Sequence, residues 1–261
     1  MIRRLTTLLL TIALTLCLAA FAEGDLLADI QSRGSLVIAT EGAWSPWTYH
    51  DESDALVGFD VEVARAIADK LGVEAKFIEC PWESIFLGID SKMYDIAANG
   101  VEVTEDRAAK YDFSTPYAYL RTALIVRADN DDIHTFEDLN GKRTANSAGS
   151  TYALLAEAYG ATTDTVSTLA QTLDLVLAGR ADATLNAELS FYDYLKEHPD
   201  AELKIVALSE EASNVAIPVR KGDENAAFLN ALNDAISSLR ADGTLKAISE
   251  KYFETDITTA Q

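Results

Sequence analysis

Cysteine, histidine and proline are scarce in this chain of 261 residues, which contains two, three and five of them respectively. One of the two cysteines, Cys17, lies in an N-terminal apolar run. If that run is removed, only Cys80 remains and an intramolecular disulfide is excluded. At this length a hydrophobic core is stable without disulfides, and core packing is the simplest interpretation of Cys80.

Sequence patterns of common catalytic and cofactor sites are also missing. There is no paired-cysteine or His-Glu-x-x-His pattern for a metal, no glycine-rich phosphate loop and no dinucleotide fingerprint. His50, His134 and His198 lie in polar surroundings, and Ser150 lacks the Gly-x-Ser-x-Gly turn of a nucleophile. We therefore expect no metal, no cofactor and no catalytic residue, although missing motifs alone do not exclude an enzyme.

Positive charge is the minority sign. The chain has 42 acidic and 21 basic residues, which gives a formal net charge of −21. So acidic a surface argues against nucleic acid and anionic membranes as partners. Most of these acids are expected to be solvated surface residues.

The first 22 residues have the features of a secretory signal peptide. Two arginines precede an apolar run over 5–18, and the sequence Ala-Phe-Ala, typical of a cleavage site, ends at Ala22. The run is shorter than the roughly 20 residues that span a bilayer, so an uncleaved anchor is the less favoured alternative. Lipid attachment at Cys17 is also less favoured, because Leu16 stands where a small residue is expected. We predict an extracytoplasmic, periplasmic or secreted protein with residues 1–22 removed.

Strand-like and helix-like segments alternate along the rest of the chain. Short apolar runs between glycines predict strands, and apolar residues recurring on one face predict helices. The expected strands are 35–40, 74–80, 95–98, 121–127, 142–146, 181–186, 203–208 and 215–219. The expected helices are 26–32, 60–71 with Asp60 as its cap, 84–92, a segment after Thr104, 135–139, 151–159, 168–180, 189–198, 226–240 and 245–253. This alternation predicts an α/β fold with mainly parallel sheets.

The segment 99–117 holds the strongest candidate for a binding residue. Thr104, followed by two acids, is expected to cap a short helix whose first turn carries Arg107. A guanidinium beside unpaired backbone N–H groups of a helix start suits one carboxylate. The alternative is an exposed arginine that pairs with acids of its own helix.

Four loops follow the carboxyl ends of expected strands or open expected helices. They begin after Thr40, at Asn99, at Ser150 and at Asn186. Open α/β sheets bind ligands beyond the carboxyl ends of their strands. If two halves of the chain face each other, all four loops line one cleft.

An ordered set of short motifs makes the chain recognisable. They are Gly58-Phe-Asp-Val-Glu-Val-Ala64, Thr104-Glu-Asp-Arg107, Asp112-Phe-Ser-Thr-Pro-Tyr117, Gly149-Ser-Thr151, Gly179-Arg-Ala-Asp-Ala183 and Asp242-Gly-Thr244. With these motifs the chain resembles the family 3 type of extracytoplasmic solute-binding proteins of polar amino-acid ABC importers, and the resemblance covers about residues 35–253. The runs Ala98-Asn-Gly-Val101 and Asp182-Ala-Thr-Leu-Asn186 look most like members assigned to cystine and related sulfur amino acids.

The resemblance implies a two-lobed α/β fold, the periplasmic-binding-protein fold, in which each lobe is a mainly parallel sheet flanked by helices. Residues 23–117 with 215–261 would form the first lobe and 121–213 the second, joined by two hinge strands within a binding domain of residues 35–255. It also implies the function: a monomer that binds a small amino acid between the lobes and delivers it to an ABC permease in the membrane.

The family's site residues map onto this chain one by one. By resemblance the ligand carboxylate is held by Arg107, by main-chain groups near Gly100 and Glu102, and by the Ser150 turn, while an aromatic and an acid contact the side chain. The predicted ligand-binding residues are Arg107, Glu41, Trp44, Trp82, Asn99, Gly100, Glu102, Ser150, Thr151 and Asn186.

Two positions depart from the family pattern. An aspartate that usually pairs with the ligand ammonium is replaced by Ala187, and a usual Ser or Thr is replaced by Glu102. A buried ammonium without an anion would be costly. Either Glu102, Glu188 or Glu41 therefore takes over the ammonium, or the ligand is not a standard α-amino acid. We favour Glu102, pointing across the cleft.

Two alternatives to a carrier are considered. A periplasmic dehydratase can use this fold with a cleft carboxylate, here Glu102, as general acid or base. A membrane-attached sensor would need a hydrophobic span after Phe253, where the sequence is polar. We expect a carrier and not an enzyme.

Overall fold

The computed structural model describes residues 25–260. The predicted signal peptide, 1–22, and Cys17 lie outside the described residues. The helices are α1 (Leu26–Arg33), α2 (Phe59–Leu71), α3 (Trp82–Asp90), α4 (Glu105–Lys110), α5 (Thr151–Ala158), α6 (Leu169–Leu177), α7 (Glu188–Glu197), α8 (Ala226–Ala241) and α9 (Thr244–Phe253), with 3₁₀ turns η1 (Phe136–Leu139) and η2 (Asp223–Asn225).

The strands are mostly short. They are β1 (Ser35–Thr40), β2 (Ala43–Trp44), β3 (Thr48–His50), β4 (Leu56–Val57), β5 (Glu74–Glu79), β6 (Ile96–Ala97), β7 (Tyr111–Phe113), β8 (Ala118–Leu120), β9 (Thr122–Arg127), β10 (Arg143–Asn146), β11 (Thr162–Thr165), β12 (Ala183–Ala187), β13 (Leu203–Leu208), β14 (Ser213–Val215) and β15 (Pro218–Arg220).

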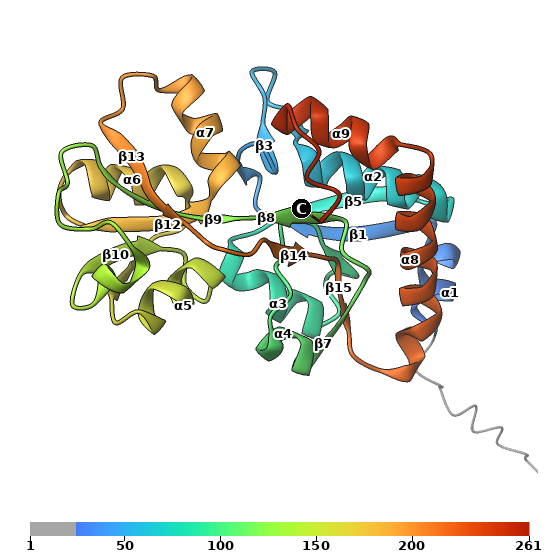
Figure 1. Ribbon diagram of the computed structural model, residues 1–261. Helices are drawn as coiled ribbons and strands as arrows, with labels where there is room; N and C mark the ends of the chain where they lie inside the picture. The colour runs from blue at the N-terminus through green and yellow to red at the C-terminus, as the bar shows by residue number, and fades with distance from the viewer. Residues whose placement is uncertain (1–24, 261) are drawn as a thin grey trace, which may run out of the picture.

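Two lobes lie side by side, and the predicted two-lobed α/β fold is confirmed (Figure 1). The first lobe contains the parallel sheet β5-β1-β6, with Ser35 of β1 opposite Glu74 and Ile38 opposite Ile96. Helices α2, α8 and α9 pack together over one face of this sheet, and α3 packs on the other. This lobe therefore combines the beginning and the end of the chain.

The second lobe contains the sheet β11-β10-β12-β9-β13. Strands β11, β10 and β12 run parallel, whereas β9 is antiparallel to β12 and β13. Helices α5, α6 and α7 cover the sheet. Between the lobes, β8 and β14 pair antiparallel, with Ser213 opposite Leu120.

Helix α2 shows how local sequence directs the fold toward the site. It begins after Gly58, whose φ of 130° suits glycine, and ends at Gly72 in the left-handed conformation. The expectation that Asp60 caps this helix is wrong, because Asp60 lies inside its first turn. Its fully buried carboxylate accepts hydrogen bonds from Tyr117 Oη, at 2.7 Å, and from the amide of Gly100. Asp60 therefore does not cap α2, and instead it supports the segment that begins at Asn99.

Several short elements were not expected from the sequence. The antiparallel set β2-β3-β4 forms where a loop was predicted, and β11 forms at the edge of the second sheet. Helix α3 begins at Trp82 instead of 84, and the cap of α4 by Thr104 is confirmed, since its side chain accepts from the amide of Arg107. No helix within residues 25–260 has both the length and the hydropathy to span a bilayer.

Candidate functional site

A pocket lies between the two lobes. Nine of the ten residues predicted to bind a ligand line it, namely Glu41, Trp44, Trp82, Asn99, Gly100, Glu102, Ser150, Thr151 and Asn186. The first lobe contributes the loops that follow β1 and β6, and the second contributes the ends of β10 and β12 with the starts of α5 and α6. Loops at the carboxyl ends of the strands thus meet, as expected for open α/β sheets.

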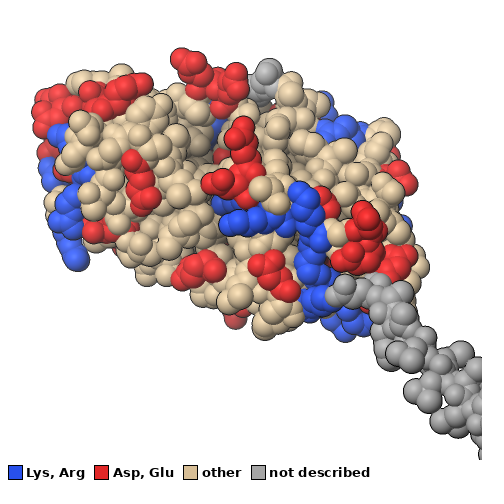
Figure 2. All heavy atoms as spheres, turned by 90° about the horizontal axis from the view of Figure 1, so that it is seen from below, with Lys and Arg blue, Asp and Glu red and all other residues tan. Residues whose placement is uncertain are grey.

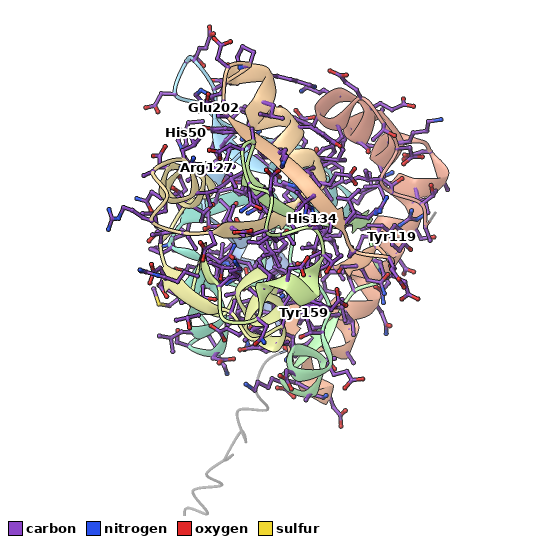
Figure 3. The ribbon with its side chains drawn as sticks, turned by 60° about the vertical axis from the view of Figure 1, so that its left-hand side comes forward. His50, Tyr119, Arg127, His134, Tyr159 and Glu202 are labelled. Atoms are coloured by element: carbon purple, nitrogen blue, oxygen red, sulfur yellow. The ribbon has the colours of Figure 1, made fainter. Side chains whose placement is uncertain are left out.

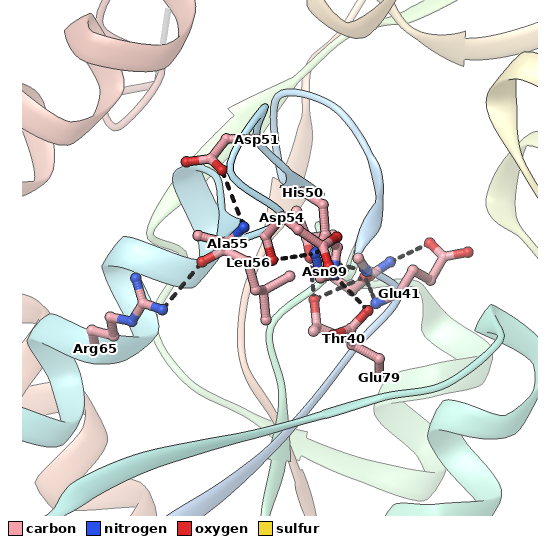
Figure 4. A network of polar contacts seen from close by, with 12 residues as sticks. Thr40, Glu41, His50, Asp51, Asp54, Ala55, Leu56, Arg65, Glu79 and Asn99 are labelled. Atoms are coloured by element: carbon pink, nitrogen blue, oxygen red, sulfur yellow. Dashed lines mark hydrogen bonds and ion pairs between the residues drawn. The ribbon is translucent and has the colours of Figure 1, made fainter.

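Glu41 and Asn99 form a paired arrangement on the first lobe (Figure 4). Asn99 Oδ1 accepts from the Glu41 amide at 2.7 Å, and Asn99 Nδ2 donates to Glu41 Oε2 at 2.6 Å. Burial raises the pKa of Glu41 to about 7, an effect that the hydrogen bond from Asn99 opposes and the nearby charge of Glu83 increases. Near neutral pH this carboxyl group therefore exists in both the charged and the neutral form.

Trp44 and Trp82 line the first-lobe wall of the pocket, and the buried Trp47 lies behind Trp44. Trp44 stacks on Trp47 with ring centroids 5.2 Å apart and planes at 10°. A Cβ atom at Gly100 would stand 2.5 Å from the ring of Trp44, so only glycine fits against it. The amide of Gly100 donates to the carboxylate of Asp60, which fixes this peptide. The indole of Trp44 packs against the same residue.

Arg107 lies directly behind the wall of the pocket, buried with 8% of its surface exposed. Its guanidinium carbon is 5.1 Å from the ring centroid of Trp82 and 5.3 Å from that of Phe86. Nη1 donates to the carbonyl of Glu102 at 2.9 Å, and Nη2 to the carbonyl of Gly149 in the other lobe at 3.4 Å. Arg107 therefore contacts a turn of the second lobe as well as its own segment.

The guanidinium of Arg107 has hydrogen-bonding capacity that the described residues leave unused. No carboxylate among residues 25–260 forms an ion pair with it, and three of its five N–H donors have no partner there. Burial lowers its pKa from the ordinary arginine value, and the charge of Glu102 opposes this shift. A buried cation of this kind favours an incoming anion.

Glu102 and Thr151 join the two lobes across the pocket. Glu102 is 5% exposed, and its Oε1 accepts a hydrogen bond from Thr151 Oγ1. Thr151 is the first residue of α5, whose cap Ser150 accepts from the Ala153 amide at 3.1 Å. The site thus contains one guanidinium and one carboxylate close to a helix N-terminus.

Hydrogen bonds from the segment 44–47 also join the lobes. Trp44 Nε1 donates to Asn186 Oδ1 at 3.0 Å, at the end of β12. Trp47 Nε1 donates to Ser190 Oγ at 3.1 Å, and Ser45 Oγ to Asp193 Oδ2 at 2.7 Å, both on α7. The first lobe's loop over 44–47 is therefore docked on the second lobe.

The pocket also contains residues that the sequence did not single out. Asn146, Ser147, Tyr152, Thr168 and Thr172 all come from the second lobe. Asn146 ends an expected strand just before the Ser150 turn, a position from which its role could have been inferred. Nothing in the sequence distinguishes Tyr152 from a core residue of its helix.

Other polar groups lie elsewhere. His50 contacts Glu79 at 2.9 Å and His134 contacts the Asp131 carbonyl at 3.0 Å, and neither lines the pocket (Figures 3 and 4). Within residues 25–260 no cluster of His, Cys, Asp and Glu is suited to a metal ion. Figure 2 shows acidic side chains scattered over one face of both lobes, with a band of basic side chains near its middle.

Two lobes with a pocket between them are the architecture of a two-lobed binding protein. The sequence matches the bacterial extracellular solute-binding proteins, family 3, over residues 36–255. The chain therefore belongs to this family.

Individual relatives sharpen the comparison. The chain is 39% identical to a probable amino-acid ABC transporter-binding protein of Haemophilus influenzae over 97% of both chains. It is 39% identical to the L-cystine-binding protein TcyA of Bacillus subtilis, over 90% of this chain and 87% of the relative. The unliganded open L-cystine solute receptor of Neisseria gonorrhoeae is 40% identical, with a TM-score of 0.60 over 90% of this chain and all of that one.

Proposed function

We propose that this protein binds a free amino acid in the interlobe pocket and delivers it to the permease of an ABC importer. The observation that carries the proposal is Arg107, a buried guanidinium with unused donors and no ion pair among the described residues. A ligand carboxylate would satisfy both the charge and the donors. The adjacent start of α5, with Ser150 and Thr151, supports the same anion from the second lobe.

Closure of the two lobes is the mechanism that the contacts support. A ligand that touches Arg107 on one side and the Ser150 turn on the other favours the closed arrangement by its differential affinity for that state. We assign residues 23–117 and 215–261 to one rigid body and 121–213 to the other, with β8 and β14 as the hinge. The permease would then recognise the closed form.

We propose cystine or a related sulfur amino acid as the ligand class. Two of the relatives described above carry L-cystine in their names, and both cover most of this chain. The pocket offers a second polar end at Glu41, next to Trp44, where the distant half of a cystine molecule would be contacted. Export through a cleaved signal peptide would place this protein outside the cytoplasm, where such ligands occur.

We propose binding without chemical conversion of the ligand. The competing function is that of a dehydratase, for which Glu41, with its pKa of about 7, has the proton affinity of a general acid. Incubation with amino acids and with prephenate-like acids, followed by mass spectrometry, distinguishes the two functions. We expect unchanged compounds, and release of a dehydrated product would overturn the carrier assignment.

Substitution of Arg107 tests the proposed function directly. Arg107→Ala removes the only charged partner proposed for the carboxylate and is expected to weaken amino-acid binding by about 2–5 kcal/mol in calorimetry. Arg65→Ala is a matched control. Arg65 also lies over an aromatic ring, Phe77 at 5.4 Å, and also donates to a backbone carbonyl, that of Leu56 at 3.1 Å, but it lies on α2 away from the pocket (Figure 4).

Thermal unfolding measured with and without L-cystine completes this test. The control should keep the ligand-induced rise in melting temperature, and Arg107→Ala should lose it. Equal affinity in wild type and Arg107→Ala would show that the carboxylate is bound elsewhere, and the proposed site would be wrong.

A further inference from the structure

Asp60 is a fully buried carboxylate of the first lobe that lies outside the interlobe pocket. Among residues 25–260 no basic side chain pairs with it, and its side chain contacts two hydrogen-bond donors. Oδ1 accepts from Tyr117 Oη at 2.7 Å, and Oδ2 accepts from the amide of Gly100. Burying a carboxylate without a cation is costly. The elements to which the two donors belong indicate what this carboxylate does.

The donor from Gly100 connects Asp60 to the pocket. Gly100 lines the pocket and packs against the ring of Trp44. Two residues further on, the carbonyl of Glu102 accepts from Arg107 Nη1 at 2.9 Å. We refer to residues 100–103 as the pocket segment. Its hydrogen bond to Asp60 therefore fixes the stretch of chain that contacts the proposed carboxylate-binding arginine.

The donor from Tyr117 connects Asp60 to the hinge. Tyr117 directly precedes β8, and its amide donates to the carbonyl of Val215 in β14 at 2.9 Å. The opposite edge of β14 pairs with the pocket segment through backbone hydrogen bonds of 2.9 and 3.0 Å. Strand β14 therefore has β8 on one edge and the pocket segment on the other, and the carboxylate of Asp60 contacts both neighbours.

The main chain at Asp60 holds a third part of the first lobe. Its amide donates to the carbonyl of Trp47 at 2.9 Å, and the amide of Phe59 donates to the carbonyl of Pro46 at 2.9 Å. The segment 44–47 in turn contacts the second lobe at α7 and at the end of β12. Asp60 thus lies where the pocket, the hinge and this interlobe contact meet.

The charge of Asp60 decides whether both side-chain hydrogen bonds are kept. A carboxylate accepts from Gly100 and from Tyr117, and every proton of the three groups has a partner. A carboxylic acid adds a third donor, so one O–H of the group is left without an acceptor, a costly arrangement at a site where Tyr117 is 1% exposed. Burial raises the pKa of Asp60 to about 7, and the two hydrogen bonds oppose this shift. Both forms are therefore present near neutral pH.

Among the described residues, Tyr117 is the one titratable group that acts on Asp60. The charged groups of the elements around α2 are engaged elsewhere: Glu62 with Lys251 of α9, Lys70 with Asp242 after α8, Arg65 with the carbonyl of Leu56 in β4, Arg240 of α8 with the carbonyl of Pro116, and His50 of β3 with Glu79 of β5. The protonation of Asp60 therefore depends on its burial and on its two donors.

We propose that Asp60 is a positioning residue for amino-acid binding, which in its ionised form ties Gly100 of the pocket to Tyr117 of the hinge. The inference rests on the proposed function and adds a regulation of the same site by protons. The intact connection keeps the pocket segment in a fixed relation to β8 and β14, so a ligand held at Arg107 favours the closed arrangement more strongly. A proton on Asp60 removes one of the two bonds, and the affinity for the amino acid falls.

Calorimetry with L-cystine at pH 6 and pH 8 tests this role in the wild type, Asp60→Asn and Tyr117→Phe. The measured quantity is the dissociation constant at pH 6 divided by that at pH 8. We expect this ratio to be at least three times larger in the wild type than in Asp60→Asn, which does not titrate. The titration of Glu41 and of the ligand itself is common to both proteins and cancels in the comparison.

Tyr117→Phe removes the hinge bond at every pH without changing the acid. Its affinity at pH 8 should fall about tenfold, and its ratio should shrink toward that of Asp60→Asn. Urea unfolding at both pH values shows whether each variant is folded. If Asp60→Asn does not fold, Tyr117→Phe alone decides.

A second tyrosine–aspartate pair of the first lobe provides the matched controls. Tyr111 Oη donates to Asp90 Oδ2 at 3.0 Å, between β7 and α3, and neither residue lines the pocket or belongs to the hinge strands. Tyr111→Phe and Asp90→Asn should change the affinity and the ratio less than twofold, whatever they do to stability.

The outcomes distinguish the inference from the function on which it rests. Folded Asp60→Asn and Tyr117→Phe proteins with wild-type affinity and the wild-type ratio would make Asp60 a purely structural residue, and amino-acid binding would stand. An equal loss of affinity in the Tyr111 and Tyr117 variants would also overturn the inference. A wild type that binds neither L-cystine nor any of the twenty common amino acids overturns the proposed function, and the inference with it.

Discussion

The two walls of the pocket differ in the charge of their side chains. The first-lobe wall carries the ionisable groups Glu41 and Glu102, with Arg107 behind it, and the indole of Trp44. The second-lobe wall is made of neutral amides and hydroxyls: Asn146, Ser147, Ser150, Thr151, Tyr152, Ser167, Thr168, Thr172 and Asn186. Charge is thus concentrated on one body, and neutral hydrogen-bonding capacity on the other.

This difference indicates that the two lobes contribute differently to ligand binding. Taking a charged group out of water is far more costly than taking a hydroxyl out of water. A second lobe that carries only neutral groups adds little to that cost when the lobes close, because hydroxyls and amides are hydrated less strongly than charged groups. We infer that the first lobe provides most of the ligand's electrostatic attraction, and that the second lobe tests its shape and orientation. The predictions below challenge this division, from the largest effect to the smallest.

The largest effect is expected from a methyl group on the first wall. Gly100→Ala would place Cβ 2.5 Å from the Trp44 ring at a residue with φ of 56°, so the indole would have to leave its place. We expect amino-acid affinity to fall at least a hundredfold in calorimetry. Gly149→Ala is the matched change in the second lobe, with a similar φ of 67° and nothing within 4 Å of the new Cβ.

Gly149→Ala should therefore cost only backbone strain, about 1–2 kcal/mol of unfolding free energy, and change affinity less than threefold. If both alanine variants lost the same affinity, backbone strain would explain the data and the close fit of Trp44 on Gly100 would not matter.

The second prediction concerns the pH dependence of stability. Glu41 on the first-lobe wall has a pKa near neutrality, whereas the second-lobe wall carries neutral amides and hydroxyls. Burial raises the pKa of Glu41 to about 7 in the folded chain, above its ordinary value of 4.5. The folded state then binds more protons than the unfolded state between these values. Stability from this group is fully present below pH 4.5 and is lost as pH rises through 7, by about 3 kcal/mol.

Urea unfolding at pH 5 and pH 8 measures this loss. Asp60 has its pKa raised to about 7 by burial as well, so the wild type carries both contributions. The difference between the two pH values should shrink by about 2 kcal/mol in Glu41→Gln. An identical pH dependence in wild type and Glu41→Gln would mean that Glu41 is well solvated and that burial does not raise its pKa.

The third prediction concerns closure without ligand contact. Ser190 accepts from Trp47 Nε1 across the lobes and does not line the pocket. Ser190→Ala leaves a buried donor unpaired only when the lobes are together, at a cost of about 1–3 kcal/mol to the closed state. Affinity should fall about tenfold, and small-angle scattering of the ligand-free protein should show a more open shape.

Ser238→Ala is the control, because Ser238 accepts from Lys70 at 2.9 Å within the first lobe. It should leave both affinity and scattering unchanged. A Ser190→Ala protein with wild-type affinity would indicate that the closed arrangement does not depend on this contact.

Much of the fold could be predicted from the sequence because its signals are local. Apolar periodicity and glycine positions gave β1, α2, β9 and α8 within a few residues, and Thr104 caps α4 as expected. Side-chain direction is less local. Asp60 was expected to cap a helix, yet its carboxylate turns inward to Gly100, which only the packing of α2 against the Asn99 segment determines.

The second-lobe part of the site was harder to predict for the same reason. The electrostatic surroundings of Tyr152 depend on residues about fifty positions away in the other lobe, because the charges of Glu102 and Arg107 act on the pKa of its hydroxyl. A buried tyrosine near the start of a helix is most often a core residue. Arg107 was proposed from its place in the first turn of an expected helix, and the other candidates, including Ser150 and Thr151 of the second lobe, were proposed from their motifs and the family resemblance. Tyr152 belongs to none of the motifs that were used.

The smallest effect on affinity is expected from a solvent-exposed ion pair between the lobes. Lys196 of α7 pairs with Glu254 of the first lobe at 2.8 Å, with 52% and 77% of the two side chains exposed. An ion pair in this setting is screened by solvent and salt and contributes little. Lys196→Ala should therefore change amino-acid affinity less than twofold at physiological salt, although it removes a contact between the lobes just as Ser190→Ala does. A tenfold loss would show that charge on the second lobe also governs closure, and the division between a charged and a neutral body would have to be given up.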